Sequence, residues 1–417
     1  MKVLLINPPS ENEIIGNNPQ IIEEERGFNP PLGLLYIAAY LEKWSDHEVV
    51  VIDAQVENLS YENLAFKVKE INPDVVGITA MTLTLVDVLE TVNCIKYFDK
   101  NITVVLGGPH VHLFPEETIS FENVDFLVLG EGEKTFKELL ENISCKEKLK
   151  KVKGLVFKDH GQNINTGFPE LIYDLDEIPF PARHLVPYKK YNSLLAQGSV
   201  ATTIFTSRGC PFNCSFCARP HLGNMFRAQS YTRVVDEIEN CINMGIKDFL
   251  FYDDTFTIDK KRVINICKEI IKRKLDIRWD IRARVDTITE EMLKCLKEAN
   301  CQGIHYGVEA GTEEMLKVLK KGITLKKVDE IFTLTRKYNI PILAYFMIGN
   351  PGETLEDMHE TFTVMKKLRP DYVHITILTP FPGTEIYNHA LEKGIYQEDY
   401  WREFSRNPQS NFEPPYW

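Results

Sequence analysis

The sequence has little that marks a secreted, membrane-spanning or nucleic-acid-binding protein. Its longest apolar run, residues 33–41, is far shorter than the ~20 residues of a membrane helix. The first residues, MKVLLINPPS, lack the charged start, long apolar core and cleavage site of a secretory signal. A net charge of −12 argues against an extended surface for a phosphate backbone. We therefore expect a cytoplasmic protein with no membrane span and no nucleic acid partner.

Cysteine is sparse along most of the chain, with nine residues in 417. In a reducing compartment these are not expected to form disulfides. Three of them, however, fall within eight residues, at Cys210, Cys214 and Cys217. We expect the other six to be buried or incidental, because free cysteine often behaves as a small core residue. These six are Cys94, Cys145, Cys241, Cys267, Cys295 and Cys301.

Residues 1–145 alternate apolar strand patterns with helical patterns. Continuous apolar strands separated by helices indicate a parallel sheet that is covered on both faces. In such sheets ligands bind beyond the carboxyl ends of the strands, and these ends are rich here in glycine and small polar residues. The expected strands are residues 2–6, 48–53, 75–79, 103–106 and 125–129.

The rest of the chain predicts a second α/β unit. Residues 146–200 contain a hairpin pattern and a proline-rich stretch, and we interpret them as a linker. Residues 201–390 return to alternating strands and helices, and Thr354–Asp357 has the spacing of a capping box. The expected strands are residues 202–207, 248–252, 278–285, 303–309, 342–348 and 372–378. The chain is thus predicted to be α/β, with an N-terminal flavodoxin-like (Rossmann-type) parallel sheet followed by a partial (β/α)6 TIM-type barrel.

A short C-terminal segment, residues 391–417, is rich in aromatic side chains. Two roles fit it equally. It closes the mouth of the barrel and lines a substrate pocket, or it covers an apolar edge of the barrel.

The three clustered cysteines directly follow the first expected strand of the barrel. Three thiolates on one loop can hold three irons of a four-iron cluster and leave the fourth iron open. His221 lies four residues beyond the last cysteine and completes a set for structural zinc, which usually takes four ligands. The spacing alone leaves both sites open.

The surrounding motifs resemble one enzyme superfamily. The C-x3-C-x2-C spacing, with an aromatic residue before the last cysteine, is similar to the radical S-adenosylmethionine signature. The strand ends FYDDTF (251–256), HYGVEAGT (305–312), FMIGNPGET (346–354) and TPFPGT (379–384) resemble further motifs of its cobalamin-binding branch. The match covers about residues 201–390.

The resemblance implies a role for each matching position. Cys210, Cys214 and Cys217 would hold a 4Fe-4S cluster whose open iron binds S-adenosylmethionine. Phe216 would lie against the adenosine, and Asp253 or Asp254 would meet the methionine ammonium. Glu309 would accept a hydrogen bond from the ammonium or the ribose, and Arg282 or Arg284 would pair with the carboxylate. The fifth and sixth motifs add Gly349 and Pro380 to the cofactor-binding residues.

Each of these residues also has a structural alternative. Asp253 and Asp254 fit a helix cap, and Glu309 fits a buried carboxylate paired with a lysine. Of Arg282 and Arg284 we expect at most one to face the barrel interior and the other to lie at the surface.

The N-terminal half resembles the cobalamin-binding domain of the same branch through GGPH (107–110), FPEE (114–117) and VLGEGE (128–133). The histidine that binds cobalt in the D-x-H-x-x-G motif is absent, because Ala54 and Gln55 follow Asp53. Cobalamin then binds without a protein ligand to cobalt, or the domain has lost it. We expect His110 to have a hydrogen-bonding or structural role. The implied cofactor-binding residues are Asn7, Pro8, Thr79, Thr82, Gly107, Gly108, Pro109, His110, Gly130, Glu131 and Gly132.

The function that the resemblance implies is cobalamin-dependent methyl transfer to an unactivated carbon or a phosphinate. It also implies a small-molecule substrate and an electron donor such as flavodoxin or ferredoxin. The first alternative is a radical oxidative cyclisation or rearrangement without methyl transfer, as in the anaerobic magnesium-protoporphyrin cyclase. The second is a zinc-stabilised binding protein without catalysis. RNA methylthiolation is set aside, because the chain lacks that group's extra N-terminal cysteines and basic C-terminal domain.

Overall fold

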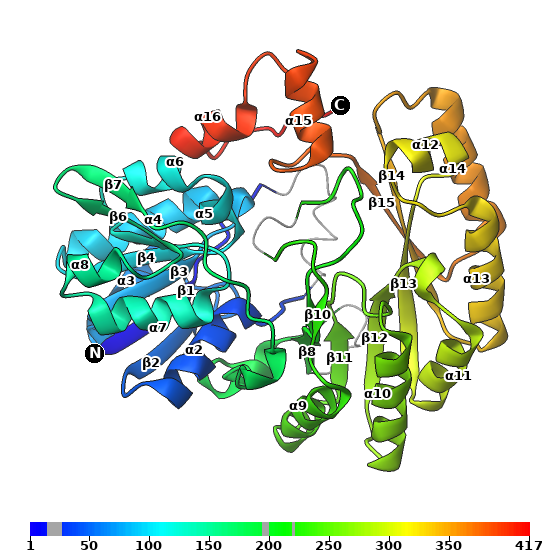
Figure 1. Ribbon diagram of the computed structural model, residues 1–417, viewed down its shortest axis with the longest axis horizontal. Coiled ribbons are helices and arrows are strands. Elements are labelled where there is room, and N and C mark those ends of the chain that lie inside the picture. Colours follow the sequence, from blue (N-terminus) through cyan, green and yellow to red (C-terminus); the bar gives the residue numbers. More distant parts are fainter. Residues whose placement is uncertain (15–26, 194–199, 219–221) are drawn as a thin grey trace.

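The computed structural model describes residues 1–14, 27–193, 200–218 and 222–417. Two sheets stand side by side in Figure 1, with the N-terminal one in blue and cyan and the second in green to orange. All neighbouring strands of the second sheet are parallel, as are β1–β5 of the first. This arrangement confirms the predicted α/β class.

The first sheet has seven strands in the order β2-β1-β3-β4-β5-β6-β7. Its central strands are buried on both faces, which is why they appear in the sequence as continuous apolar runs. The strands are β1 (Lys2–Asn7), β2 (Glu48–Asp53), β3 (Val75–Thr79), β4 (Thr103–Gly107), β5 (Phe126–Val128), β6 (Leu155–Asp159) and β7 (Gln162–Asn165).

Helices cover both faces of this sheet. One face packs against α2 (Leu32–Trp44), α7 (Gly132–Asn142) and α8 (Lys146–Leu149). The other packs against α3 (Tyr61–Ile71), α4 (Leu85–Phe98) and α6 (Pro115–Ser120). The short helix α5 (Pro109–Leu113) directly follows β4.

We expected the segment 146–200 to be a linker, but it also forms part of the first sheet. Its hairpin, β6 and β7, pairs antiparallel with β5 and extends the first sheet. The reason is that β5 leaves an open edge and three consecutive apolar residues, Leu155–Phe157, are buried there. Further along, Arg183 forms a buried ion pair of 2.8 Å with Glu237 in the second unit.

The second sheet has the order β15-β14-β13-β12-β11-β8, in agreement with the six strand–helix units predicted. It is a partial barrel, because its sequential parallel order does not close on itself. The strands are β8 (Ala201–Ile204), β11 (Asp248–Phe251), β12 (Arg278–Ala283), β13 (Cys301–Glu309), β14 (Ile342–Ile348) and β15 (Tyr372–Ile377).

Helices with apolar faces cover the outside of the barrel (Figure 1). The predicted capping box is present at α14, where Thr354 and Asp357 exchange hydrogen bonds at the first turn. The helices are α9 (Tyr231–Asn243), α10 (Lys260–Lys272), α11 (Glu290–Glu298), α12 (Glu313–Val318), α13 (Leu325–Lys337) and α14 (Leu355–Leu368), followed by α15 (Glu385–Glu392) and α16 (Tyr400–Arg406).

The C-terminal segment crosses back to the first unit, as the red helices at the top of Figure 1 show. Trp401 is completely buried and donates from Nε1 to the carbonyl of Pro380 at 2.9 Å. Phe404 joins Leu85 and Phe114 of the N-terminal unit in one apolar cluster. Neither role that we had assigned to this segment includes that contact.

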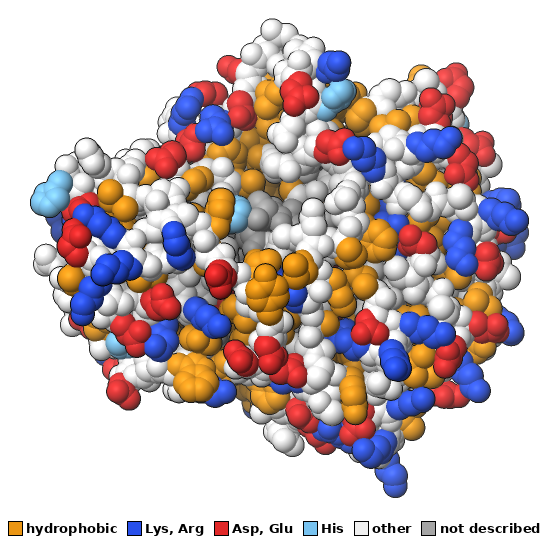
Figure 2. Space-filling model, viewed as in Figure 1, with side chains coloured by type: hydrophobic (Ala, Val, Ile, Leu, Met, Phe, Trp, Pro, Cys, Tyr) orange, Lys and Arg blue, Asp and Glu red, His pale blue; other side chains and the backbone are white. Residues whose placement is uncertain are grey.

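Charged side chains of both signs are interspersed over the face in Figure 2. Apolar side chains gather along its middle, between the two sheets. No helix in the described part of the chain is long and apolar enough to cross a membrane.

Candidate functional site

The cysteine loop leaves the barrel directly after β8. Its base is closed by a short antiparallel pair of strands, β9 (Ser207–Arg208) and β10 (Arg227–Ala228). Gly209 has a φ of +78°, and a Cβ there would lie 2.3 Å from the carbonyl oxygen of Met225. Only glycine fits this position, because both the backbone angle and the close approach exclude a side chain.

The first two thiols of the loop have polar neighbours. Cys210 is buried, and its Sγ lies 3.7 Å from Oγ1 of Thr255. Cys214 Sγ lies 3.6 Å from Nη1 of Arg284, whose guanidinium stacks on Phe212 at 3.7 Å. A guanidinium therefore lies beside one of the three sulfurs of the loop.

The three thiols of this loop suit the donor set of an iron–sulfur cluster, which takes Cys thiolates as ligands. Among the described residues no three Cys, His, Asp or Glu side chains converge closely enough to hold one metal ion. A cluster does not require such convergence, because each of its thiolates binds a different iron. His221, the alternative zinc ligand, lies outside the described residues.

Asp253 supports the base of the cysteine loop. It is completely buried and accepts hydrogen bonds from Thr206 N at 2.9 Å, Thr206 Oγ1 at 2.8 Å and Ser207 Oγ at 2.5 Å. Burial raises its pKa, while Arg262 and these donors act against the rise. Asp254 is exposed, so of the two it is better placed for an ammonium group. Neither caps the next helix, which Asp259 caps instead.

Glu309 is a buried carboxylate paired with a lysine, which is the structural alternative noted above. Lys321 Nζ lies 2.7 Å from Glu309 Oε1 and 5.8 Å from the centre of the Phe216 ring. Glu309 itself has a φ of +76°. The pair also depends on Gly307, because a Cβ there would lie 2.3 Å from Glu309 Oε1. Phe216 and Glu309, expected to meet the same cofactor, thus share Lys321 as a neighbour.

Arg282 has the features of a binding group for an anion. Its guanidinium stacks on the Tyr252 ring at 3.8 Å, and its buried Nε has no hydrogen-bond partner within the described part of the chain. Arg284 is instead committed to Asp286 and to the Lys321 carbonyl. Gly349, which has a φ of +78°, and the buried Pro380 follow the ends of β14 and β15.

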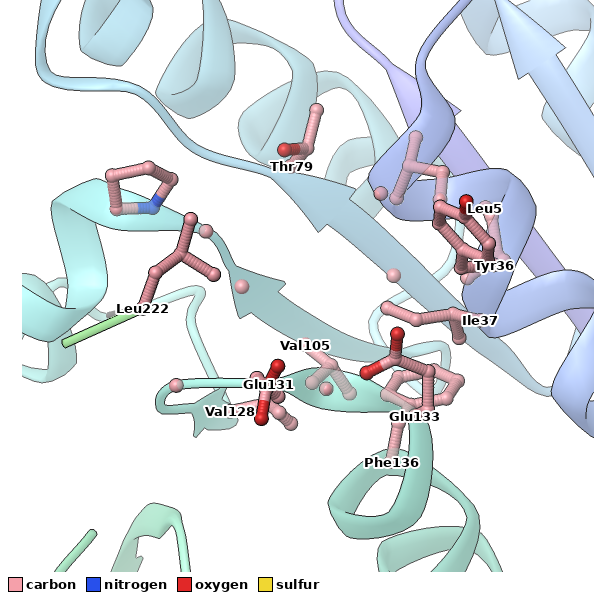
Figure 3. A pocket seen from close by; sticks show the side chains of 18 of the residues that line it. Leu5, Tyr36, Ile37, Thr79, Val105, Val128, Glu131, Glu133, Phe136 and Leu222 are labelled. Carbon is pink, nitrogen blue, oxygen red and sulfur yellow. The ribbon is translucent and has the colours of Figure 1, made fainter. Parts of the chain in front are cut away.

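A cavity of about 260 Å³ lies beyond the carboxyl ends of β3, β4 and β5 (Figure 3). In Figure 3, Leu222 approaches it from one side and Tyr36 and Ile37 from the other, with Glu131 and Glu133 below. The barrel unit contributes part of the wall, so both units build the cavity. Seven of the expected cofactor-binding residues line it, namely Thr79, Gly107, Gly108, Pro109, Gly130, Glu131 and Gly132.

Glycine keeps this cavity open. A Cβ added at Gly107 would meet only the Val128 carbonyl oxygen, at 3.8 Å, and one added at Gly33 would meet nothing within 4 Å. Apolar side chains such as Leu5 and Phe136 form much of the wall. A mostly apolar cavity lined by glycines at the strand ends can take a flat aromatic group, and the nucleotide tail of cobalamin ends in such a group.

Glu131 lies in the wall, but its carboxylate is already bound by protein groups. Oε1 accepts from Arg208 at 2.7 Å, and Oε2 accepts from Arg227 at 2.8 Å and from Ile172 N at 2.7 Å. Burial pushes its pKa upward, but the two arginines outweigh this, and the pKa lies below its ordinary value. Its hydrogen bonds therefore assign it to the contact between the units rather than to a ligand.

The remaining expected residues lie away from this cavity wall. His110 is completely buried with Nδ1 3.1 Å from Thr82 Oγ1. Asn7 donates to Asp53 Oδ1 at 2.8 Å, and Tyr191 donates to Asp53 Oδ2 at 2.7 Å. The aspartate of the incomplete cobalt-ligand motif is thus capped by protein groups, and the buried Pro8 lies beside Asn7.

A polar group inside the barrel was missed by the sequence reasoning. Asp280 Oδ2 lies 3.6 Å from His305 Nε2, and His305 Nδ1 lies 3.2 Å from the Tyr345 hydroxyl. Burial raises the pKa of Tyr345. Asp280 and His305 border a polar cavity of about 220 Å³ at the amino ends of the strands. Asp280 and His305 alternate with apolar residues on β12 and β13, and this alternation is the sequence signal that indicates an inward-facing side chain.

Comparison with known proteins agrees with this architecture. Residues 21–140 match the B12 binding domain, and residues 204–365 match the radical SAM superfamily. A protein of Pyrococcus horikoshii named as an uncharacterized methyltransferase is 37% identical over 411 residues, which is 97% of this chain and 86% of the relative. The chain belongs to the cobalamin-binding radical S-adenosylmethionine enzymes.

Other relatives place this radical S-adenosylmethionine enzyme in a varied group. The anaerobic magnesium-protoporphyrin IX monomethyl ester cyclase of Cereibacter sphaeroides is 32% identical over 379 residues, covering 89% of this chain and 62% of the relative. The solved methyltransferase TsrM from Kitasatospora setae, with cobalamin and a [4Fe-4S] cluster bound, has a TM-score of 0.76 at 22% identity, covering 94% of this chain and 75% of TsrM. That likeness shows the shared fold. The cofactors of this enzyme are a 4Fe-4S cluster, S-adenosylmethionine and cobalamin.

Proposed function

We propose that this enzyme transfers a methyl group to an unactivated carbon, or to a phosphinate phosphorus, of a small organic molecule. The observation that carries the proposal is the composite cavity. Its wall includes Phe205, Ser207, Arg208 and Leu222, which flank the cysteine loop on both sides. A cofactor bound at the first sheet would therefore face the loop that would hold the cluster. The proposed reaction requires this proximity, because S-adenosylmethionine has to restore the methyl group of cobalamin.

The residues of the barrel divide the work of binding. Cys210, Cys214 and Cys217 would hold the cluster, and Arg282, whose Nε has no hydrogen-bond partner among the described residues, would receive the carboxylate of S-adenosylmethionine. Phe216 and Glu309, which share Lys321 as a neighbour, would flank the nucleoside part. When bound, the cluster and S-adenosylmethionine supply one-electron hydrogen abstraction, and cobalamin supplies the methyl group.

The first sheet would hold cobalamin by its nucleotide tail in the cavity, with Thr79 and Thr82 beneath the ring. No residue replaces the cobalt-binding histidine at Gln55, so the cobalt would have no ligand from that position. An enzyme of this kind works in the cytoplasm and takes its electron from a carrier such as flavodoxin or ferredoxin.

The first experiment measures the cofactors directly. The protein is purified without oxygen and reconstituted with iron, sulfide and hydroxocobalamin, beside a Cys210→Ala, Cys214→Ala, Cys217→Ala variant. We expect about four irons and one cobalt in the wild type and loss of iron in the variant. Iron without cobalt would contradict cobalamin-dependent methylation. Zinc without iron would favour the structural zinc alternative.

A second experiment separates methyl transfer from radical cyclisation, which the cyclase relative favours. The reduced enzyme is incubated with S-adenosylmethionine and fractionated small-molecule extract, and both nucleoside products are measured. Methyl transfer predicts S-adenosylhomocysteine together with 5′-deoxyadenosine, because one S-adenosylmethionine restores the methyl group and another starts the radical reaction. Extract-dependent 5′-deoxyadenosine alone would refute the methyl-transfer proposal.

A further inference from the structure

We call the cavity of about 260 Å³, in which we place the nucleotide tail, the tail cavity. One buried ionic group joins the base of the cysteine loop to the wall of this cavity. Arg208 on β9 and Arg227 on β10 are directly paired across the two-stranded ladder. Both project onto Glu131 of the first unit, and Arg208 also reaches Glu133 at 2.5 Å. We name these four residues, Glu131, Glu133, Arg208 and Arg227, the interdomain clasp.

The clasp lies beside both cofactor sites, and of its four residues only Glu131 was expected to bind a cofactor. Glu131, Glu133 and Arg208 line the tail cavity. Arg208 is two residues before Cys210, and the rigid Gly209 turn lies between them. A shift of either arginine therefore moves one arm of the hairpin that carries all three cysteines.

The side chains of the clasp are largely buried. Those of Glu131 and Arg227 are 2% and 3% exposed, Glu133 is 5% exposed and Arg208 is 14% exposed. Removing one partner from a buried ion pair leaves the other charge uncompensated, which is strongly unfavourable. The four side chains therefore hold one another in position, and a displacement of one of them affects the others.

We propose that Glu131, Arg208 and Arg227 are positioning residues that couple filling of the tail cavity to the geometry of the cysteine loop. A nucleotide tail in the cavity packs against the clasp and holds it closed, and a closed clasp holds the two arms of the loop together. Coupling of this kind is reciprocal, so a bound cluster must also strengthen binding of the tail. The inference rests on the proposed position of the tail.

The test measures hydroxocobalamin binding in protein with and without the cluster. Cobinamide, which has the corrin ring but no nucleotide tail, is the matched ligand. We expect the cluster to tighten hydroxocobalamin binding at least about fivefold and to leave cobinamide binding nearly unchanged. In Glu131→Gln the cluster-dependent factor should fall toward one, whereas Glu141→Gln, at an exposed ion pair on the same helix, should retain it.

The reciprocal measurement needs no variant. Release of iron from the wild-type cluster to a chelator should slow at least about fivefold when hydroxocobalamin is bound and not when cobinamide is bound. Equal binding of hydroxocobalamin and cobinamide would refute the proposed place of the tail. Tail-dependent binding without any effect of the cluster, or an unchanged factor in Glu131→Gln, would refute the clasp alone.

Discussion

His110 makes the stability of this protein depend on pH in a measurable way. The ring is completely buried, Nδ1 is hydrogen-bonded to Thr82, and Nε2 has no hydrogen-bond partner among the residues that the structure describes. Burial lowers its pKa from 6.5 to about 3, so the ring stays neutral in the folded protein. In the unfolded chain the same ring takes up a proton near pH 6.5.

The sign of the effect follows from where the proton binds. Between about pH 6.5 and pH 3 the unfolded state binds one more proton than the folded state. The stability is therefore complete above pH 6.5 and is lost as the pH falls toward 3. One pH unit within this window corresponds to about 1.36 kcal/mol, so lowering the pH from 7 to 5 removes roughly 2 kcal/mol through His110 alone.

Isothermal urea unfolding at pH 7 and pH 5 measures this loss. His110→Gln should lose about 2 kcal/mol less than the wild type between the two pH values. His359→Gln, at an exposed position on α14, should lose as much as the wild type. An equal loss in His110→Gln and the wild type would refute the reasoning, as would a His110 proton resonance that titrates near pH 6.5 in the folded protein.

Three further substitutions test the cavity, the cysteine loop and the C-terminal segment. Gly107→Leu fills the cavity and should weaken hydroxocobalamin binding about 100-fold, or roughly 2.7 kcal/mol, by equilibrium filtration. Gly209→Ala should prevent iron uptake on reconstitution, while Gly245→Ala, equally left-handed but with open space, should not. Trp401→Ala should lower the free energy of unfolding by about 3–5 kcal/mol, against little change for the half-exposed Trp44→Ala. Unchanged binding, iron content or stability in these variants would contradict the corresponding assignment.

The elements that were predictable from the sequence are those whose signals are local. Strand β3 has the predicted bounds because a short, mostly apolar run between polar residues is typical of a buried strand. The ends of helix α3 also have local signals, since Ser60 caps its start and Asn72 takes the left-handed conformation at its end. The cysteine trio was visible for the same reason, because its three members lie within eight residues.

What was not predictable depends on partners far along the chain. Glu131 resembles a cofactor contact in its motif, yet its partners, Arg208 and Arg227, lie 77 and 96 residues away in the chain. Lys321, which pairs with Glu309, carries no motif of its own. A carboxylate in a glycine-rich turn looks the same in sequence whether it meets a ligand or an arginine. Only the three-dimensional arrangement distinguishes the two.

The C-terminal segment gives the chain a second connection between its two units. Residues 146–200 join them once, and α16 returns to α6, where Arg402 pairs with Glu117 at 2.6 Å. The two units are therefore connected both by the linker and by the C-terminal segment, and not by a single linker alone. The units therefore cannot swing apart freely about one hinge, and neither is a self-contained module for exchange with another protein. Cutting the chain after α15 would expose the apolar patch around Leu85 and Phe114, so recombination of this architecture has to move both units together.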